Sequence, residues 1–200
     1  MKSTLVRQSL AGLRLLLVMT AILGVLYPLA VWGVSRLPGL RAGAEGSQVV
    51  VDGRVVGSSL IGVDPVPADP ARDPYFHLRP AASAQTATGP GDPSATGGSN
   101  LAGDNPELLA AVGERRAVIA AREGVAPERV PVDAVTASAS GVDPHISPAY
   151  ADLQVPRVAR VTGLPEAEVR RLVAEHTSGG VVEERVVNAT ELNLAVEAAS

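Results

Sequence analysis

The sequence contains no cysteine and only one lysine, Lys2, beside sixteen arginines. Without a thiol, the chain cannot form a disulfide, bind zinc or an iron–sulfur cluster through thiolates, or use a cysteine nucleophile. A phosphate-binding loop of the Walker type needs a lysine directly after its glycines, and Lys2 follows no such loop. These absences exclude several kinds of catalytic site and leave such chemistry to partners.

Aromatic residues are also scarce, since they make up 2% of the 200 residues. Glycine (20) and proline (16) are frequent, which is typical of a chain with many turns and loops. The length allows one ordinary domain, with a core built mainly from valine, leucine and alanine. We therefore expect an irregular α+β domain, and the sequence shows no internal repeat.

Charge is unevenly distributed along the chain. The first 36 residues contain four basic residues and no acidic one, whereas the other 13 arginines stand against 21 acidic residues. The formal charge of −4 thus joins a basic N-terminal segment to a body that carries −8. An acidic body argues against binding to nucleic acid.

Residues 15–34 form a run of twenty residues without a charge. As an α-helix this run spans roughly 30 Å, the thickness of bilayer hydrocarbon, and it predicts a single transmembrane helix. A cleaved signal peptide is the alternative, but its apolar region is only about 7–15 residues long. Thr20 and Gly24 lie four residues apart, a spacing that lets another helix approach closely.

The basic residues around this run predict its orientation. Three precede it and two arginines follow it closely, so the positive-inside tendency places the N-terminus in the cytoplasm. The expected organisation is a cytoplasmic N-terminus (1–14), a transmembrane helix (15–34), a linker (35–46) and an extracytoplasmic α+β domain (47–200). We therefore predict a single-pass protein of the cell membrane.

Turn-forming residues divide the C-terminal part into elements. Asp52-Gly53 stands between runs of β-branched residues and predicts a hairpin. Four prolines make residues 64–74 a loop, because proline cannot pair inside a sheet. Residues 81–104 contain one large apolar residue, Leu101, and predict a second, long loop.

Cap residues predict the helices. Asn105 before Pro106 begins a helix that runs to about Glu123, and Gly124 ends it. Its apolar residues are expected to face the core (Leu108, Ala111, Val112, Ile119) and its charged residues to face water (Glu114, Arg115, Arg116, Arg122). Ser147-Pro148, Pro156 and Pro165 predict further helices near 148–154, 156–162 and 165–176. Residues 181–187 suit a strand, and Asn188 with Glu191 predicts a capped helix to about Ala198.

Five polar residues between positions 138 and 147 are the strongest catalytic candidates: Ser138, Ser140, Asp143, His145 and Ser147. A hydrolytic triad needs a nucleophile and an acid on either side of a histidine, and sequence neighbours seldom achieve this. The alternative is a loop that caps the helix beginning near Pro148 and whose histidine bonds buried polar groups. The corresponding alternative function is a membrane-anchored extracytoplasmic serine hydrolase that uses Ser138 or Ser140 with His145 and Asp143.

Metal binding has weaker support. His77, His145 and His176 are scattered, and none has the spacing of a known ligand motif. Asp143 and His145 are a candidate pair for a shared cation. We expect no metal site.

Six segments carry a resemblance to a known family: GSSLIG (57–62), YFHLRP (75–80), GGSN (97–100), VDAVTASASGVDPHIS (132–147), QVPRVA (154–159) and VVNATELNLAV (186–196). Behind a single N-terminal span, and in this order, they make the chain similar to the C subunits of the Kdp potassium-transporting ATPase. The sequence departs mildly from the family pattern at Ala81, Thr96 and Val142, where family members usually have serine, serine and leucine.

The resemblance implies a complex in which a channel-like A subunit conducts potassium, a P-type ATPase B subunit hydrolyses ATP, and a small F subunit sits beside them. The C subunit is then non-catalytic; it stabilises the assembly and acts as a catalytic chaperone that raises the ATP affinity of the B subunit. The family attribution of nucleotide binding falls on Gly97, Gly98, Ser99 and Asn100, which conflicts with an extracytoplasmic domain. The interface candidates are the helix face with Gly24 and the loops 97–100 and 138–147, and a sensor domain is a third possible role.

Overall fold

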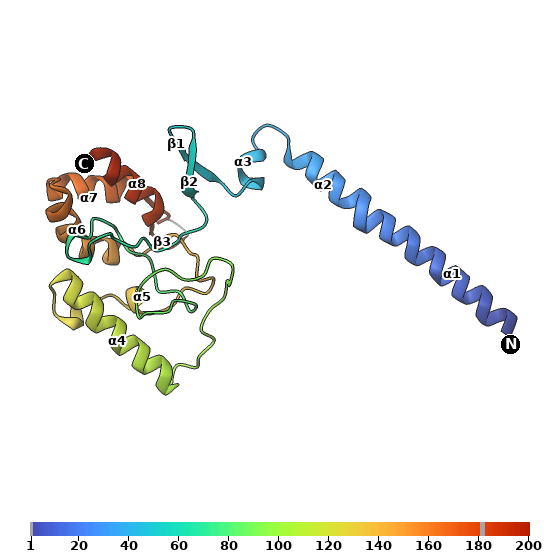
Figure 1. Ribbon diagram of the computed structural model, residues 1–200, viewed down its shortest axis with the longest axis horizontal. Coiled ribbons are helices and arrows are strands. Elements are labelled where there is room, and N and C mark those ends of the chain that lie inside the picture. The colour runs from blue at the N-terminus through green and yellow to red at the C-terminus, as the bar shows by residue number, and fades with distance from the viewer. Residues whose placement is uncertain (1, 181–182) are drawn as a thin grey trace. The chain divides into compact units, whose positions relative to one another are not determined.

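The computed structural model describes residues 2–180 and 183–200, and Figure 1 shows the order of their elements. Contacts within the chain divide it into two compact units, Met1–Ser47 and Gln48–Ser200, which are described separately.

The first unit is dominated by one long helix made of α1 (Lys2–Ala21), the π-helical turn η1 (Ile22–Leu26) and α2 (Tyr27–Ser35). The wide turn has a local cause, because Pro28 has no N–H and its ring would clash with the carbonyl of Gly24 in a regular α-helix. From Ser3 to Ser35 the helix is 33 residues long and apolar enough to cross a membrane. The predicted span 15–34 lies within this longer helix.

The segment after the helix is ordered. It contains the short helix α3 (Arg41–Ala44), and Glu45 accepts hydrogen bonds from Arg36 at 2.6 Å and from Arg41 at 3.1 Å.

The second unit begins with the predicted hairpin. Strands β1 (Gln48–Val51) and β2 (Arg54–Ser58) pair antiparallel, with a bulge after Val49. Asp52 and Gly53 both have positive φ, 49° and 76°, as the tight turn of a two-residue hairpin requires. The hairpin prediction is therefore confirmed.

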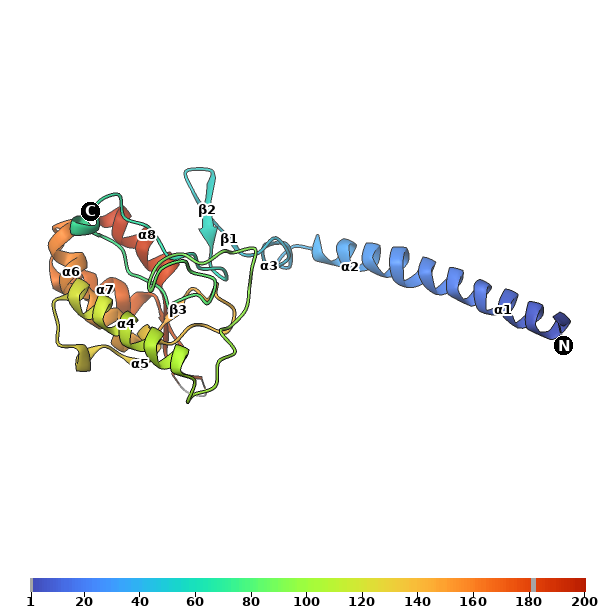
Figure 2. The same ribbon diagram turned by 60° about the horizontal axis from the view of Figure 1, so that its bottom comes forward.

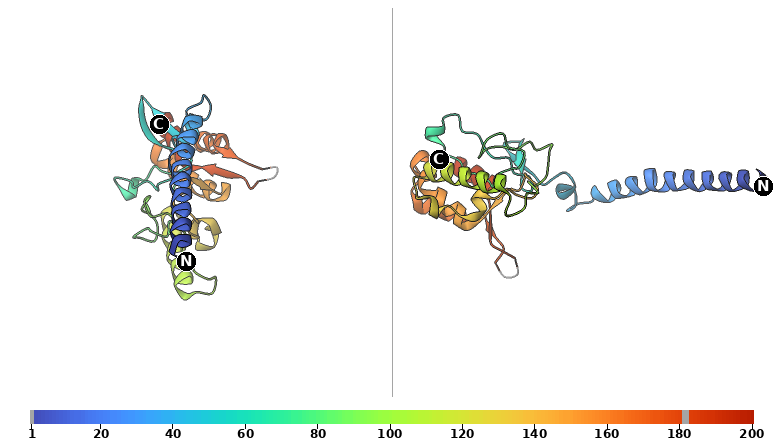
Figure 3. Two further views of the ribbon diagram at one scale, coloured as in Figure 1. Left: turned by 90° about the vertical axis from the view of Figure 1, so that its right-hand side faces the viewer. Right: turned by 90° about the horizontal axis from the view of Figure 1, so that it is seen from below.

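Helices, a small sheet and long loops make up the rest of this unit. The helices are α4 (Pro106–Glu123), α5 (Val132–Val135), α6 (Pro148–Thr162), α7 (Glu166–Glu175) and α8 (Ala189–Ala199), with the 3-10 turns η2 (Pro70–Arg72) and η3 (Pro127–Arg129). The strands β3 (His145–Ile146), β4 (Thr177–Ser178) and β5 (Val186–Asn188) form an antiparallel sheet in the order β3-β5-β4 (Figure 3). The expected α+β domain is confirmed.

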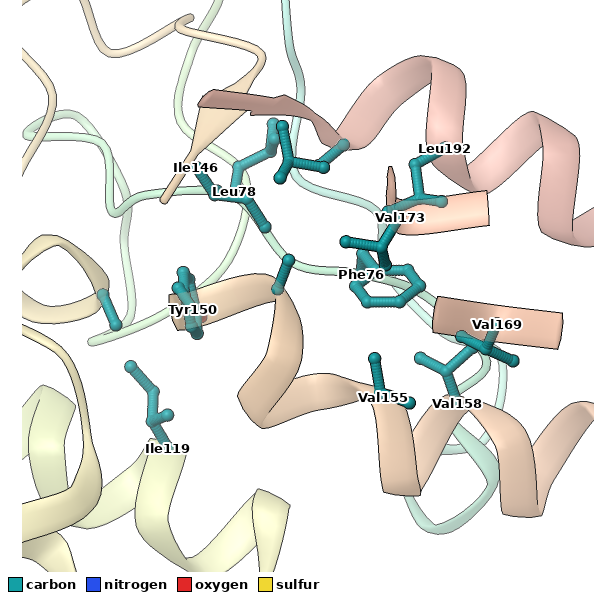
Figure 4. Close-up of a cluster of buried hydrophobic side chains, with 14 of the residues drawn as sticks. Phe76, Leu78, Ile119, Ile146, Tyr150, Val155, Val158, Val169, Val173 and Leu192 are labelled. Atoms are coloured by element: carbon teal, nitrogen blue, oxygen red, sulfur yellow. The ribbon is translucent and has the colours of Figure 1, made fainter. Parts of the chain in front are cut away.

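The core lies between the sheet and helices α6, α7 and α8. Phe76, from the segment before the long loop, is fully buried among valines of α6 and α7 (Figure 4). Leu192 of α8 and Ile146 of β3 are also buried in this cluster. The single phenylalanine thus lies at the centre of a core that is otherwise aliphatic, apart from Tyr150.

The predicted helix caps form as expected. The side chain of Asn105 accepts from the N–H of Glu107 at 2.8 Å, and that of Ser147 accepts from Tyr150 at 3.0 Å. Asn188 caps α8 by accepting from the N–H of Glu191 at 3.1 Å. Gly124 ends α4 in the left-handed conformation, with φ 68°.

Two predictions of secondary structure were wrong. Residues 148–162 form one helix, α6, rather than two, because Pro156 lies on its exposed face while Val155 and Val158 are fully buried. Burial on both sides of the proline outweighs the cost of about 3 kcal/mol that an internal proline adds. The expected strand 181–187 is reduced to β5, since residues 183–185 are not in a strand and 181–182 lie outside the described residues. The loop 81–104, in contrast, has no helix or strand, as predicted.

Candidate functional site

The segments that resemble the family lie far apart in sequence but meet in space. Their loops are joined by backbone hydrogen bonds: Gly62 N–H to Val142 O (2.8 Å), Gly97 N–H to Ser140 O (2.8 Å), Ser138 N–H to Pro80 O (3.0 Å) and Ala189 N–H to Pro144 O (2.9 Å). The side chain of Asn188 also donates to the carbonyl of Ser59 at 2.9 Å. The loop 138–147 is therefore the centre on which four other segments converge.

The loop 97–100 packs against this centre through its glycines. A β-carbon at Gly98 would lie 3.5 Å from the backbone of Ala139, so the two loops are in close contact. The N–H of Gly97 is already used by Ser140, whereas Ser99 and Asn100 are exposed. The structure thus brings together the two loops that the sequence marks as interface candidates.

The serines of the loop 138–147 do not form a catalytic triad with His145. Ser138 Oγ accepts from the N–H of Gly141 at 2.8 Å, and Ser140 Oγ accepts from Val142 at 3.2 Å. Within the described residues, the ring of His145 is bonded only to Asp143, at 3.1 Å. These serine hydroxyls shape the turn, and the geometry gives the hydrolase alternative no support.

The alternative interpretation of this loop predicted a cap for the helix near Pro148 and a histidine bonded to buried polar groups, and only the cap is confirmed. Ser147 caps α6, and it is itself held by Asp133, which accepts from the Ser147 hydroxyl at 2.8 Å. His145, however, has a side chain that is 32% exposed, so the expectation that it bonds buried polar groups was wrong. Its partner, Asp143, is similarly exposed.

A buried polar centre around His77 was not anticipated from the sequence. The two ring nitrogens of His77 contact two carboxylates, Asp64 Oδ2 at 2.9 Å and Asp73 Oδ2 at 2.6 Å. All three side chains are at least nine-tenths buried. Because both nitrogens face carboxylate oxygens, the geometry suits a proton on each of them, that is, an imidazolium between two carboxylates.

The backbone of this centre is held as firmly as its side chains. Gln154, fully buried on α6, accepts from the N–H of His77 at 2.8 Å and donates to its carbonyl at 3.2 Å. Asp64 Oδ1 accepts from the N–H of Leu78 at 2.6 Å. The proline-containing loop 64–74 is therefore fixed at both ends to α6 and to the segment that carries His77.

Arg157 and Arg122 extend the centre toward α4. Arg157 donates to the carbonyl of Asp73 at 2.7 Å and contacts both oxygens of Glu123, at 3.2 and 3.0 Å. Arg122 bonds Glu123 at 2.7 Å and the hydroxyl of Tyr150 at 3.0 Å. With His77 protonated, three cations balance three carboxylates in this centre, as buried charges require.

The pKa values of the centre follow from this pairing. Burial by itself lowers the pKa of His77, but the hydrogen bonds to Asp64 and Asp73 outweigh it and raise this pKa above its ordinary value. Burial raises the pKa of Asp73, but the hydrogen bond and charge of His77, with the charge of Arg157, lower it overall. Burial raises the pKa of Tyr150 to about 12, so its hydroxyl stays neutral at ordinary pH.

The prediction that the charged residues of α4 face water was wrong for two arginines. The side chain of Arg122 is only 15% exposed, and Arg115 donates to the carbonyls of Ala87 and Val135 at 3.2 Å each. Both arginines lie on α4 and bond to residues of other segments, Arg115 to Ala87 and Val135 and Arg122 to Tyr150. Helical periodicity in the sequence cannot reveal such contacts. For the polar centre itself, the sequence offered one signal: His77 lies in the segment YFHLRP (75–80), which carries the family resemblance.

A pocket of about 550 Å³ opens beside the centre. Its walls are formed by prolines of the loop 64–74, by Thr86, Thr88 and Pro90 of the long loop, and by Val118 of α4. His77, Asp73 and Arg122 also line it, and both histidine nitrogens are already hydrogen-bonded. The pocket is therefore mainly apolar, and residues 97–100 are not part of its lining.

Comparison with known proteins identifies the family of this chain. A family model described as "K+-transporting ATPase, c chain" matches residues 9–198. The chain is 50% identical over 202 residues to the potassium-transporting ATPase KdpC subunit of Kineococcus radiotolerans, a match that covers 99% of this chain and 97% of the relative. The KdpC subunits of Streptomyces coelicolor (44% identity, 93% and 90% covered) and Sorangium cellulosum (49%, 94% and 96%) are also similar.

Six segments joined in one fold, an N-terminal apolar helix and a match over nearly the whole length agree with one another. The chain therefore belongs to the KdpC family, the C subunits of potassium-transporting ATPases.

Proposed function

We propose that the chain is an accessory, non-catalytic subunit of a high-affinity, ATP-driven potassium uptake pump, anchored in the cell membrane by its N-terminal helix. Its partners are the channel-like A subunit, the P-type ATPase B subunit and the small F subunit, whose assembly it stabilises. The observation that carries this proposal is the family match over residues 9–198, which includes both the apolar helix and the folded domain. The buried charges of that domain support a structural role, because they are paired within the fold.

The proposed orientation places the N-terminus in the cytoplasm and the domain outside. Lys2, Arg7 and Arg14 precede the apolar run and outnumber Arg36 and Arg41 after it. The guanidinium carbon of Arg36 lies over the ring of Trp32, 5.1 Å from its centroid. Trp32 and Tyr27 lie toward the C-terminal end of the apolar run, and such aromatic residues favour the membrane interface. The chain without cysteine is compatible with an oxidising exterior.

A single cysteine in place of Leu109 tests this orientation. Leu109 is 59% exposed on α4, and the absence of other cysteines makes its labelling specific. In intact cells or spheroplasts, we expect a membrane-impermeant maleimide to label Leu109→Cys without lysis. A cysteine in place of Ser3 is the matched control and should be labelled only after lysis. The reverse pattern would contradict the orientation.

The finer proposal is that this subunit raises the ATP affinity of the B subunit through contacts in the complex. Removing the chain from the purified pump is then expected to raise the KM for ATP roughly fivefold or more, the range of coupling between separate sites. The double variant Ser99→Ala/Asn100→Ala should leave the KM unchanged, because an exterior loop does not meet cytoplasmic ATP. Steady-state ATPase assays of the assembled pump give both values.

Direct contact between ATP and Gly97–Asn100 stays a prediction of the family resemblance. If the double variant alone raises the KM for ATP as much as removal of the subunit while the pump stays assembled, the loop contacts nucleotide. The proposed orientation would then also be wrong.

A further inference from the structure

Exposed apolar side chains of the second unit are concentrated in one stretch. Eleven large hydrophobic residues of the described part of this unit are exposed, and eight of them lie between residues 50 and 66. We call these eight the hairpin patch: Val50, Val51, Val55, Val56, Leu60, Ile61, Val63 and Val66. Their exposed fractions lie between 44% and 68%. Because side chains alternate along a strand, Val50 and Val55 lie on one face of the hairpin and Val51 on the other. An exposed apolar face of this kind is typical of an interaction surface rather than of scattered surface residues.

The hairpin that carries half of this patch has little support of its own. Its two strands pair only with each other among the described residues, and Val50 stands directly opposite Val55. In Figure 2 the tip of the hairpin stands clear of helix α8. A two-stranded hairpin is marginally stable in water, so this one gains from a surface that covers its valines.

The base of the hairpin is tied to the domain. A β-carbon at Gly57 would lie 3.5 Å from the side chain of Thr190 on α8. Val56 and Val63 line a small groove with Leu194 of the same helix. The domain therefore presents the hairpin in a defined position, as an interface requires, rather than as a loose extension.

The composition of the patch favours a protein partner over lipid. Segments that lie in the membrane interface are rich in tryptophan, tyrosine and basic residues. Residues 48–66 contain no aromatic residue and no lysine, and their charges are Asp52, Arg54 and Asp64. The aromatic residues suited to the interface, Tyr27 and Trp32, are in the anchor instead.

The position of the patch in the chain also limits its partner. Only twelve residues separate the end of the helix at Ser35 from the start of β1 at Gln48. Fully extended, they would reach roughly 40 Å, and α3 and its turns shorten this reach. The hairpin must therefore act near the membrane surface, where the other subunits of a membrane-embedded pump emerge.

We propose that the hairpin patch is a docking surface for an apolar, extracytoplasmic face of another subunit of the pump. The proposal rests on the proposed function and adds the surface through which this subunit is held. Val50 and Val55, which face each other across the strands, form the centre of the contact.

Thiol accessibility tests this docking directly, because the chain has no other cysteine. Val50→Cys is reconstituted in nanodiscs, which leave both membrane faces open, once as the chain alone and once in the assembled pump. We expect maleimide to label Val50→Cys quickly in the chain alone and at least roughly tenfold more slowly in the pump, the ratio for a contact of ordinary strength. Leu109→Cys is the matched control, and its labelling rate should be the same in both.

Three results would overturn the proposal. Equal labelling of Val50→Cys in both samples means that no subunit covers the hairpin. Protection in the chain alone means that lipid covers it, and a disulfide between two copies in the chain alone means that a second copy does. Because nanodiscs expose both faces, none of these results depends on the orientation tested with intact cells.

A second variant separates binding from folding. Val50→Thr/Val55→Thr keeps the shape and the β-propensity of both residues but makes the contact polar. We expect thermal unfolding of the chain to be unchanged and recovery of the pump in gentle detergent to fall roughly tenfold. Leu109→Thr should leave recovery unchanged. Normal recovery of the double threonine variant would contradict the proposal.

Discussion

Replacement of His77 by alanine is expected to lower the free energy of unfolding of the C-terminal domain by about 3–5 kcal/mol, the cost of breaking a buried ion pair by removing one partner. The variant leaves two buried carboxylates, Asp64 and Asp73, without the cation between them. Urea unfolding of the full chain in detergent, followed by circular dichroism, measures the loss. His145→Ala is the matched control; its histidine also pairs with a carboxylate but is 32% exposed, so the loss should be no more than about 1 kcal/mol.

The His77 centre also predicts how stability depends on pH. The pKa of His77 is raised in the folded state, so its contribution is fully present below the unfolded value of about 6.5 and is lost as pH rises through the folded value. The pKa of Asp73 is lowered, so its contribution is present above about 3.8 and is lost as pH falls through the folded value. Between these limits the centre is most stabilising.

His77→Gln isolates the alkaline part of this dependence, because glutamine cannot lose a proton there. The groups around the histidine are Asp64, Asp73, Arg122, Arg157, Glu123 and Tyr150, and none is a second histidine. We expect the wild-type domain to lose stability above neutral pH and the glutamine variant to show a flatter curve. Parallel curves for the two proteins would show that His77 is not charged in the fold.

Replacement of Phe76 by alanine should cost about 3–5 kcal/mol as well, but through loss of packing rather than of charge pairing. Phe76 is fully buried and is the only phenylalanine of the chain. Few other large side chains can fill the space it leaves, because the surrounding core consists mainly of valine, alanine and leucine. Urea unfolding at one pH measures this loss, and the pH dependence should keep the wild-type form.

Tyr75→Ala is the control for Phe76→Ala, since Tyr75 is the adjacent residue but is only half-buried at the edge of a small groove. Its loss should be clearly smaller. The backbone at Phe76 should stay in place, because the side chain of Asn193 accepts from its N–H at 2.7 Å and donates to its carbonyl at 2.8 Å. A loss below about 1 kcal/mol for Phe76→Ala would show that the core closes around the missing ring.

The elements that could be predicted from the sequence are those with local causes. Asn105, Ser147 and Asn188 each cap a helix within three residues of their own position, so their identity and spacing were sufficient. Asp52-Gly53 determines the hairpin in the same way. Pro156 misled the prediction, because the burial of its neighbours, which keeps α6 intact, depends on helices elsewhere in the chain.

The polar centre could not be predicted for the same reason. Asp64, Asp73 and His77 lie near one another in sequence, but Gln154, Arg157 and Glu123 come from helices 46 or more residues further on. On a helical projection Arg122 resembles any solvated charge, and only tertiary contact with Tyr150 shows that it is buried. The loops of the candidate site could be named from the sequence by resemblance, whereas their mutual hydrogen bonds became visible only in the fold.

The wide turn η1 changes which residues of the anchor share a face. In a regular α-helix each residue advances by about 100°, so the residue seven positions after Thr20, which is Tyr27, would lie almost above it. The π-helical turn accommodates one extra residue and shifts the rotational phase of everything after it. Pro28, eight positions after Thr20, therefore lies almost above Thr20 instead, on the same side of the helix as Thr20 and Gly24. A partner helix that follows this line meets threonine, glycine and proline in succession, with the tyrosine ring turned to one side.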